Sequence, residues 1–494
     1  MNKAEKTINT AIIQFATSNI HLAASLEILH NEFNLENNNH YNLLGQATFF
    51  PSRMAKTAQT LRGKAPRKLK ILVKKADPNV NFIDKIKYDK AWVKKNMEEF
   101  SRQLKSLTYI SDLESIKNDL ISPGPALANE IVSLSRNTEI NLNKNQKIIL
   151  RLLRSYLEVY SHTLNLITVN RITRVHIYNG RFIHERASWD AAKQLGCEVL
   201  IFETTHNRYQ QRIEGFHNRV NNQKVMKDFW KNSDIELSEK IKLSSKWFNV
   251  MKSTVNPFLI RDPNKFLPEK KYFVYYSNSD DEVVGFWDEW KETLGNQLTV
   301  VDQLINIFSE QEKYNLIIRL HPNLLNRPPS VISKWQSLKM KRNSIMIQPG
   351  ERISSYELMD YCVGVINFGS TIGIEAAYYK KPVLVLADCK YDELGIADKL
   401  TRWDDVESWI GNAEFISDEL LAERMMNSLV FGFYFHECGT HFANTELNKT
   451  NQLGAWDAKY FMGVKINESK ILIDYRRLLM KFKFWIIKGE LKFE

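Results

Sequence analysis

Two short polar segments in the second half of the chain carry side chains of the kinds that bind phosphate. His321 stands in RLHPN, directly after the apolar run 314–318, and Ser370 and Thr371 stand in NFGST, directly after the apolar run 362–366. Hydroxyl residues at a helix start can cap the helix, and the N–H groups there bind anions. Because open α/β sheets bind ligands at the carboxyl ends of their strands, this pair predicts a nucleotide phosphate site.

A βαβ unit is needed to position Ser370. The apolar run 383–386 is the expected next strand, and the helix before it carries small residues, in GIEAA, where it must lie close to the sheet. Glu375 lies one turn into this helix and can reach the hydroxyls of a ribose. The alternative is an ordinary capped crossover helix without a ligand.

Charged side chains also follow apolar runs in the first half of the chain. Glu203 comes directly after one such run, and Glu185 opens a helix shortly after the expected strand 174–178. Carboxylates in these positions are candidates for general acid or base work. Arg181 and Arg186 suit anionic sugar or phosphate groups. Glu185 and Arg186 equally fit an exposed ion pair with no function.

An acidic segment, SNSDDE, follows the expected strand 272–276. It contains Ser279, Asp281 and Glu282. Serine and aspartate favour the start of a helix, which is the alternative without chemistry. Acidic residues near a phosphate site would be electrostatically unfavourable without a role, and this favours a function. Ser354 starts a further short helix and is another candidate for binding an anion.

Length and composition predict a soluble globular protein with two domains, because the chain has 494 residues, of which 44% are hydrophobic and 25% charged. The net charge of +11 predicts anionic partners: a nucleotide, a phospholipid surface or a lipid-phosphate acceptor. No nucleic-acid motif is present, so nucleic acid is not an expected partner.

Four cysteines without a CxxC pair predict a reducing compartment. With neither a signal peptide nor a membrane-length apolar run in the sequence, we expect a cytoplasmic location.

The order of expected strands and helices predicts an α/β fold with two Rossmann-like domains and C-terminal helices. Residues 1–258 form the expected N-terminal domain, with a helical insertion, and a proline-containing linker follows. Residues 270–425 form the expected nucleotide-binding domain. Residues 426–494 form the expected helical region.

Two basic segments are candidates for contact with the inner face of the cytoplasmic membrane. Residues 62–75 are dense in lysine and arginine, and residues 471–493 mix basic and aromatic side chains. The alternatives are a solvated face for the first segment and a helix that packs back on the N-terminal domain for the second.

The segments RLHPN and FGSTIGIEAAYYKKPV resemble those of GT-B glycosyltransferases that build bacterial surface polysaccharides, namely capsule and lipopolysaccharide. The similarity is strongest to capsule-synthesis proteins and to transferases that use CMP-linked Kdo or sialic acid, and it covers roughly residues 175–390. Polyol-phosphate transferases that use CDP-glycerol share a similar HP element. The resemblance implies two domains that face a cleft, a nucleotide-sugar donor in the C-terminal domain and a lipid-linked saccharide acceptor in the N-terminal domain.

The resemblance also implies roles for individual residues. His321 and the Ser370–Thr371 pair would hold the donor phosphate and stabilise its developing charge, so that neither a metal nor another cofactor is expected. By similarity to retaining Kdo transferases, one of Asp280, Asp281 and Glu282 would act at the anomeric carbon, and Asp281 is the favoured residue. The implied catalytic residues are Asp281, Glu203, Glu282 and His321, the donor-binding residues are Ser279, Arg319, His321, Ser354, Ser370, Thr371 and Glu375, and the acceptor-binding residues are Arg181, Glu185 and Arg186.

Three other functions fit the same features. The donor can be a UDP-, GDP- or dTDP-hexose, since the same fold accepts these nucleotides. The reaction can be a CDP-glycerol-type polyol phosphotransfer. The protein can also be a non-catalytic binding partner in polysaccharide assembly, because a fold does not establish an activity.

Overall fold

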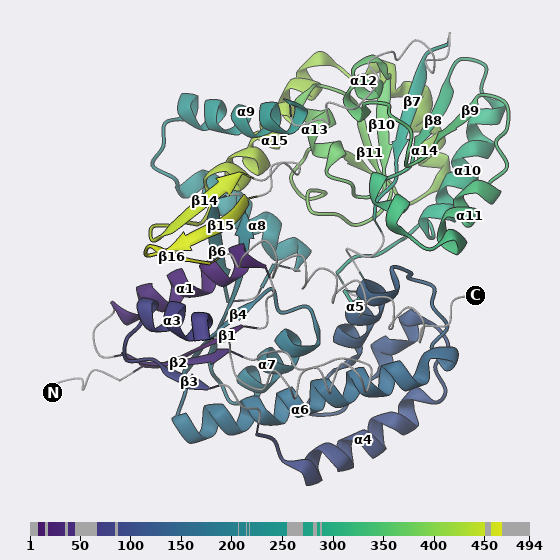
Figure 1. Ribbon diagram of the computed structural model, residues 1–494. Helices are drawn as coiled ribbons and strands as arrows, with labels where there is room; N and C mark the ends of the chain where they lie inside the picture. Colours follow the sequence, from purple (N-terminus) through teal and green to yellow (C-terminus); the bar gives the residue numbers. More distant parts are fainter. Residues whose placement is uncertain are drawn as a thin grey trace. The chain divides into compact units, whose positions relative to one another are not determined.

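The computed structural model describes residues 8–14, 18–34, 38–44, 67–83, 87–205, 207–213, 215–216, 218–253, 270–279, 284–286, 289–449 and 456–466. The chain divides into two compact units, of which unit 1 comprises residues 1–216 and 439–494 and unit 2 comprises residues 217–438. Each unit has a mainly parallel sheet with helices on both faces (Figure 1). The predicted α/β class is confirmed.

Unit 2 is built on a six-stranded sheet in which each strand pairs with its neighbours in parallel. The strand order is β12-β11-β10-β7-β8-β9. Every residue of β7, YFVYY, is buried, as expected for a parallel strand covered on both faces. The strands are β7 (Tyr272–Tyr276), β8 (Asn315–Arg319), β9 (Ser344–Ile347), β10 (Gly364–Asn367), β11 (Val383–Val385) and β12 (Asp398–Lys399).

Alternate side chains of these strands enter two separate cores, because successive residues of a strand point to opposite faces. Val274 packs toward α12, α13 and α15, whereas Phe273 and Tyr275 pack toward α10, α11 and α14. The helices are α10 (Gln297–Glu310), α11 (Pro329–Ser337), α12 (Ser355–Tyr361), α13 (Ile372–Tyr378), α14 (Trp403–Asn412) and α15 (Asp418–Glu437).

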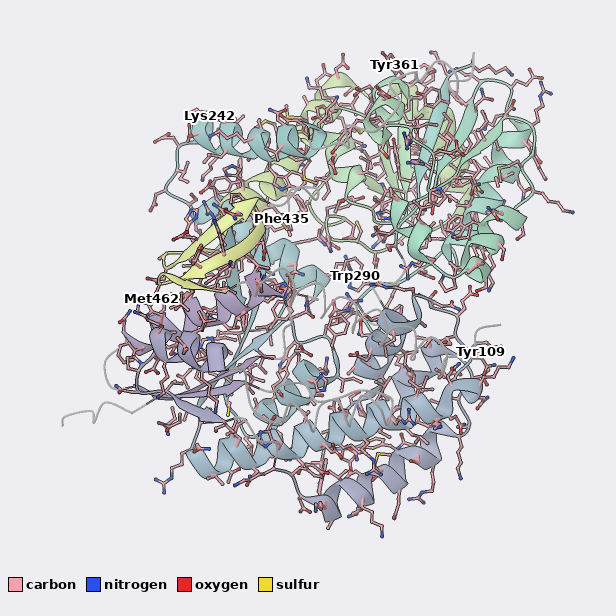
Figure 2. The ribbon with its side chains drawn as sticks, in the orientation of Figure 1. Tyr109, Lys242, Trp290, Tyr361, Phe435 and Met462 are labelled. Atoms are coloured by element: carbon pink, nitrogen blue, oxygen red, sulfur yellow. The ribbon has the colours of Figure 1, made fainter. Side chains whose placement is uncertain are left out.

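Aromatic packing assigns two helices before the sheet to unit 2. Helix α9 (Leu237–Ser253) contacts α15 through Trp247, whose ring lies 5.3 Å from that of Phe431 and 6.2 Å from that of Phe435 (Figure 2). Helix α8 (Arg219–Asn232) also packs on α15. The unit boundary therefore lies at Phe216, before these helices, whereas the sequence placed the domain end at residue 258.

Unit 1 has a seven-stranded sheet in the order β13-β6-β5-β4-β1-β2-β3. Its first five strands in chain order are parallel, and β6 and β13 extend one edge in antiparallel pairing. The strands are β1 (Ile8–Gln14), β2 (Asn38–Leu44), β3 (Asn81–Ile83), β4 (Arg174–Tyr178), β5 (Glu198–Thr205), β6 (Arg208–Arg212) and β13 (Thr440–His441).

Two layers cover this sheet. Ile12 faces α1, α3 and a small sheet of β14, β15 and β16, while Ala11 and Ile13 face α6 and α7. A helical insertion between β3 and β4 contains α4 and α5 in addition to α6. The remaining elements named here are α1 (Asn19–Phe33), α3 (Arg67–Ala76), α4 (Lys90–Leu104), α5 (Gly124–Ser135), α6 (Gln146–Asn170), α7 (Ile183–Gln194), β14 (Thr445–Lys449), β15 (Trp456–Phe461) and β16 (Val464–Lys465).

One expectation about secondary structure is wrong. Residues 426–494 were expected to be a helical region, but after α15 the described residues 438–449 and 456–466 contain the short strands β13 to β16. These strands are two to six residues long, and β13 pairs with β6, which is distant in sequence. The basic-aromatic tail 471–493 lies outside the described residues.

Candidate functional site

The sheet of unit 2 has a point where the strand order reverses. From β7 the chain proceeds outward to β8 and β9 on one side, and then β10, β11 and β12 proceed outward on the other side. Open α/β sheets bind ligands outside the carboxyl ends of the strands at such a point. The three central strands β10, β7 and β8 end there. The segments that follow them contain Ser370–Thr371, Ser277–Ser279 and His321, respectively.

His321 is fixed by two hydrogen bonds at the end of β8. Its backbone N–H donates to the hydroxyl of Ser277, with an N···O distance of 2.8 Å. Its Nδ1 accepts from the backbone N–H of Asn323 at 3.1 Å, and this bond caps the short helix η5 (Pro322–Asn326). Because Nδ1 is the acceptor, the proton of the neutral imidazole is on Nε2, which can donate to an anionic ligand.

The loop after β7 connects to the segments on both sides. Ser279 is 2% exposed, and its hydroxyl accepts from Nη2 of Arg327 at 3.0 Å. Asn278 donates from Nδ2 to the carbonyl of Phe368, after β10, at 3.4 Å. Arg327 thus adds a positive charge at this edge of the sheet. The sequence analysis did not identify Arg327, because no motif marks an arginine six residues after His321 as part of a site.

A buried amide shapes the turn after β10. The Oδ1 of Asn367 accepts from the backbone N–H of Gly369 at 2.9 Å and from the hydroxyl of Tyr391 at 2.8 Å. Gly369 has a φ of +88°, in the left-handed region that favours glycine. A Cβ on Gly373 would lie 2.2 Å from the Tyr391 hydroxyl. Only glycine at this position therefore leaves room for the hydrogen bond from Tyr391 to Asn367.

Ser370 and Thr371 follow this turn, but they do not cap α13 as expected. Thr371 occupies the N-cap position with helical backbone angles, and its side chain accepts no capping hydrogen bond. Ser370 is half-buried and Thr371 is exposed. Their hydroxyls therefore remain able to bind a ligand at the edge where His321 lies.

Glu375 is placed on the inner side of α13. It is 4% exposed and accepts a hydrogen bond from the hydroxyl of Tyr356 on α12. Burial raises the pKa of Glu375 to about 7, although the bond from Tyr356 acts in the opposite direction. Contact with a ribose stays a prediction for this residue.

Arg319 and Ser354 hold backbone segments on the other side of the site. Arg319 is 5% exposed and donates to the carbonyls of Gln348 at 2.7 Å and Glu351 at 3.2 Å, which fixes the loop after β9. Ser354 caps α12 by accepting from the N–H of Glu357 at 3.3 Å. These contacts are structural, and binding of a donor by either residue stays a prediction.

Unit 1 has its own reversal of strand order, between β1 and β4. Here Nε2 of His21 lies 2.9 Å from the hydroxyl of Tyr178, and the two rings stack with centroids 4.0 Å apart. Burial lowers the pKa of His21 to about 4, so the imidazole is neutral at pH 7. Glu203 accepts from Nδ2 of Asn179 at 2.7 Å. Burial, then Glu203 and Glu185, raise the pKa of Tyr178.

Glu185 lies in the first turn of α7 and is buried, at 6% exposure. Burial raises its pKa to about 8, and the neighbouring Glu130 on α5, whose own pKa burial raises to about 7, contributes to this shift. Within the described chain, Oε2 of Glu185 has no hydrogen-bond partner. Glu185 is therefore a protonated acid at neutral pH. Sequence reasoning missed Glu130, because it lies on a separate helix some fifty residues earlier.

The two arginines predicted near Glu185 have other partners. Nε of Arg186 donates to Oδ1 of Asp190 at 2.9 Å, and Nε of Arg181 donates to Asn129. The alternative of an exposed Glu185–Arg186 ion pair is therefore wrong. A role of these arginines in binding an acceptor stays a prediction.

Some predicted features have no structural description. Asp280, Asp281 and Glu282 lie outside the described residues, so their roles stay predictions. Within the described ranges, no group of three or more histidine, cysteine, aspartate or glutamate side chains is arranged to hold a metal ion. Those ranges likewise contain no helix long and apolar enough to cross a membrane.

Comparison with known proteins supports the resemblance inferred from the sequence. Residues 288–416, about a quarter of the chain, match the family described as capsule polysaccharide biosynthesis protein. This segment contains His321, Ser370 and Thr371. The chain is thus similar to capsule polysaccharide biosynthesis proteins over the part that carries these three residues. No curated protein sequence matches the chain.

Several solved structures are similar to this chain at low sequence identity. A β-Kdo 2,4-transferase, KpsC of Thermosulfurimonas dismutans, is 11% identical, with 52% of this chain and 79% of that chain covered and a TM-score of 0.35. MnaA of S. aureus, solved with UDP, is 15% identical, with 85% and 91% covered and a TM-score of 0.30. The UDP-GlcNAc 2-epimerase of Neisseria meningitidis, bound to UDP-GlcNAc, is 13% identical, with 85% and 93% covered and a TM-score of 0.30. Similarities at this level do not identify an activity.

Proposed function

We propose that the protein is a glycosyltransferase of capsule polysaccharide assembly. It moves a sugar from a nucleotide-activated donor to a growing polysaccharide or its lipid-linked acceptor. A CMP-linked acidic sugar such as Kdo is the favoured donor. The observation that carries the proposal is the convergence of Ser277, His321 and the Ser370–Thr371 pair on one edge of the sheet in unit 2, at its reversal of strand order.

The groups at this edge suit a phosphate. Nε2–H of His321 and the hydroxyls of Ser370 and Thr371 are hydrogen-bond donors, and the Arg327 guanidinium is positively charged. Donors that are already in place stabilise negative charge as it develops on a leaving nucleotide phosphate. In this proposal they take the place of a divalent metal, and Asp281 acts at the anomeric carbon.

The acceptor belongs, in this proposal, to unit 1. Glu203, Glu185, Arg181 and Arg186 lie on or after β4 and β5, at the edge where this sheet also reverses its strand order. Glu203, hydrogen-bonded to Asn179 at 2.7 Å, suits a general base. A lipid-linked acceptor would bring the protein to the inner membrane surface.

Thermal shift with CMP, CDP, UMP, UDP and GDP tests the donor site. Binding to the folded state raises the melting temperature by mass action. We expect CMP to stabilise the wild type selectively, and His321→Ala to weaken its binding by about tenfold, which corresponds to about 1.4 kcal/mol. His321→Gln should retain part of the affinity, because its amide N–H can replace Nε2–H. Lys242→Ala, at an exposed site on α9, is the control.

The other outcomes identify the alternatives. Selective stabilisation by CDP would indicate polyol phosphotransfer, and stabilisation by UDP or GDP would indicate a hexosyltransferase. Transfer is checked by incubation with CMP-Kdo and a saccharide acceptor, with the product bond identified by mass spectrometry. If none of the nucleotides stabilises the protein, the phosphate site is refuted.

A further inference from the structure

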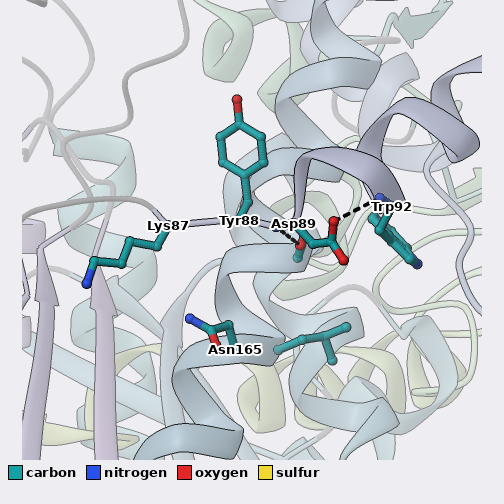
Figure 3. Close-up of a pocket in the computed structure, with 7 residues that line it drawn as sticks. Lys87, Tyr88, Asp89, Trp92 and Asn165 are labelled. Atoms are coloured by element: carbon teal, nitrogen blue, oxygen red, sulfur yellow. Dashed lines mark hydrogen bonds between the residues drawn. The ribbon is translucent and has the colours of Figure 1, made fainter.

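A pocket of about 430 Å³ opens in unit 1 beside the first turn of α4 (Figure 3). It lies between the segment 87–89, α4 and α6. Its lining does not include His21, Tyr178, Glu185 or Glu203. The volume is within the range of roughly 300–1,000 Å³ that is typical of small-molecule sites. Its lining residues are Lys87, Tyr88, Asp89, Trp92, Ser161, Leu164 and Asn165.

The wall of this pocket is held in place by hydrogen bonds. Oδ1 of Asp89 caps α4 by accepting from the N–H groups of Ala91 at 2.8 Å and Trp92 at 3.0 Å. The N–H of Asp89 donates to the hydroxyl of Ser161 on α6 at 3.0 Å. The segment is therefore tied to both helices, and a ligand would meet a site that is already formed.

Trp92 gives the pocket an aromatic wall. One side of its ring stacks on Tyr160, with centroids 5.3 Å apart and an angle of 17° between the planes. This packing limits the freedom of the indole, so that little conformational entropy is lost when a ligand packs against it. Sugar rings have an apolar C–H face that suits such a surface, and hydroxyl edges that need hydrogen bonds.

Polar groups suited to hydroxyls line the rest of the pocket. Lys87 and Asn165 lie at one end and Trp92 at the other (Figure 3). Within the described residues, neither the ammonium of Lys87 nor the amide of Asn165 has a hydrogen-bond partner. Lys87 carries a positive charge and Asp89 a negative charge. Asp89 would repel a polyphosphate. The lining thus favours a neutral or singly acidic sugar over a nucleotide.

We propose that this pocket binds one or two sugar rings of a saccharide. The apolar face of a ring packs on Trp92, its hydroxyls bond to Asp89, Ser161 and Asn165, and Lys87 pairs with the carboxylate of an acidic sugar. The proposal that this pocket is a binding site follows from its lining residues alone. The choice of capsule-type saccharides as ligands rests on the proposed function.

Saturation-transfer NMR tests the proposal with neutral disaccharides, N-acetylhexosamine disaccharides and disaccharides that contain a hexuronic acid or Kdo. We expect transfer to ring C–H protons for at least one class. Asn165→Ala and Trp92→Leu should each weaken that binding by about tenfold, and Trp92→Phe should weaken it less because it keeps an aromatic face. Lys87→Ala should reduce binding of acidic sugars only. Lys94→Ala, on α4 but outside the lining, is the matched control.

Three results would overturn the proposal. These are the absence of transfer to every disaccharide, unchanged binding in both Asn165→Ala and Trp92→Leu, and displacement of the saccharide by CMP. His321→Ala separates this proposal from the nucleotide site, because it should leave saccharide binding unchanged. If no nucleotide stabilises the protein but saccharide binding depends on Trp92, the proposed function fails and the pocket stands.

Discussion

The backbone N–H of His321 donates a hydrogen bond of 2.8 Å to the hydroxyl of Ser277, a residue 44 positions earlier in the chain. Ser277 follows β7 and His321 follows β8, so this bond joins the ends of two neighbouring strands. Ser277 is only 1% exposed, and water cannot readily replace its hydroxyl. The position of the histidine backbone therefore depends on this serine.

Ser277→Ala should destabilise unit 2 and weaken nucleotide binding together. The substitution leaves a partly buried N–H without an acceptor, which costs about 1 kcal/mol. For a unit of this size, that cost lowers the melting temperature by about 2–4 °C. The check is a thermal melt with and without CMP. Ser333→Ala, whose exposed hydroxyl donates to Ser330 of the same helix, is the control and should melt as the wild type does.

Gly373→Ala should destabilise the turn that carries Ser370 and Thr371. Its Cβ would lie 2.2 Å from the hydroxyl of Tyr391 and 2.7 Å from Nδ2 of Asn367, and both side chains are buried. Overpacking of this kind costs about 1–3 kcal/mol. Differential scanning calorimetry measures the loss, and the response to CMP should fall with it.

Gly411→Ala is a matched control for this substitution. Gly411 lies in α14, and an added Cβ would meet no atom within 4 Å. Alanine in a helix is more stable than glycine by roughly 0.5–1 kcal/mol, so this variant should melt slightly higher than the wild type. Equal effects of the two substitutions would show that the contact with Tyr391 has no importance.

Central strands of both sheets were predictable because buried parallel strands are continuous apolar runs. The run 272–276 was predicted and coincides with β7, and the run 174–178 coincides with β4. Since the polar segments after such runs must lie at carboxyl ends, the positions of His321 and Ser370 followed from the sequence.

Features that depend on pairing between distant segments were not predictable. Strand β13 is two residues long and is defined by pairing of Thr440 with Tyr209 and of His441 with Arg208. Neither segment is apolar enough to indicate a strand. The proximity of Glu130 to Glu185 likewise depends on how α5 packs on α7. This packing does not produce a characteristic spacing of residues in the sequence. A long-range contact between two helices has no local pattern to reveal it.

Glu185→Gln should change how stability depends on pH. Because burial raises the pKa of Glu185 to about 8, the folded state keeps a proton that the unfolded state loses above its ordinary pKa near 4.5. The stability that this protonation contributes is fully present below pH 4.5 and is lost as the pH rises to about 8. Glutamine stays neutral, so the variant should match the wild type at pH 5 and melt a few degrees higher at pH 8.

Melting curves between pH 5 and pH 8.5 check this expectation, with Glu98→Gln at an exposed site on α4 as the control. The control should change neither the melting temperature nor its slope with pH. If Glu185→Gln runs parallel to the wild type across this range, then Glu185 ionises in the folded protein as it does in water, which would contradict a raised pKa.

Arg219→Ala should be the most destabilising of these substitutions. The carboxylate of Asp392 is fully buried and accepts from Nη1 of Arg219 at 2.6 Å and from Lys399 at 2.8 Å. Burial alone would raise the pKa of Asp392, but Lys399, Gln223 and Arg219 lower it overall. Removal of one partner of a buried pair costs about 3 kcal/mol, because it leaves charge uncompensated. Urea unfolding of the two proteins measures this difference.

The control for this last substitution is Lys242→Ala, in the exposed pair with Glu239 on α9 (Figure 2). Exposed pairs contribute little, so the control should lose less than about 0.5 kcal/mol.

The contribution of Asp392 has its own pH dependence. Since its folded pKa is lowered, this stability is present above about pH 4 and is lost as the pH falls below that value. Arg219→Ala should therefore flatten the acid side of the stability curve. If the stability of Arg219→Ala falls below pH 4 as steeply as that of the wild type, then Lys399 alone holds Asp392 ionised.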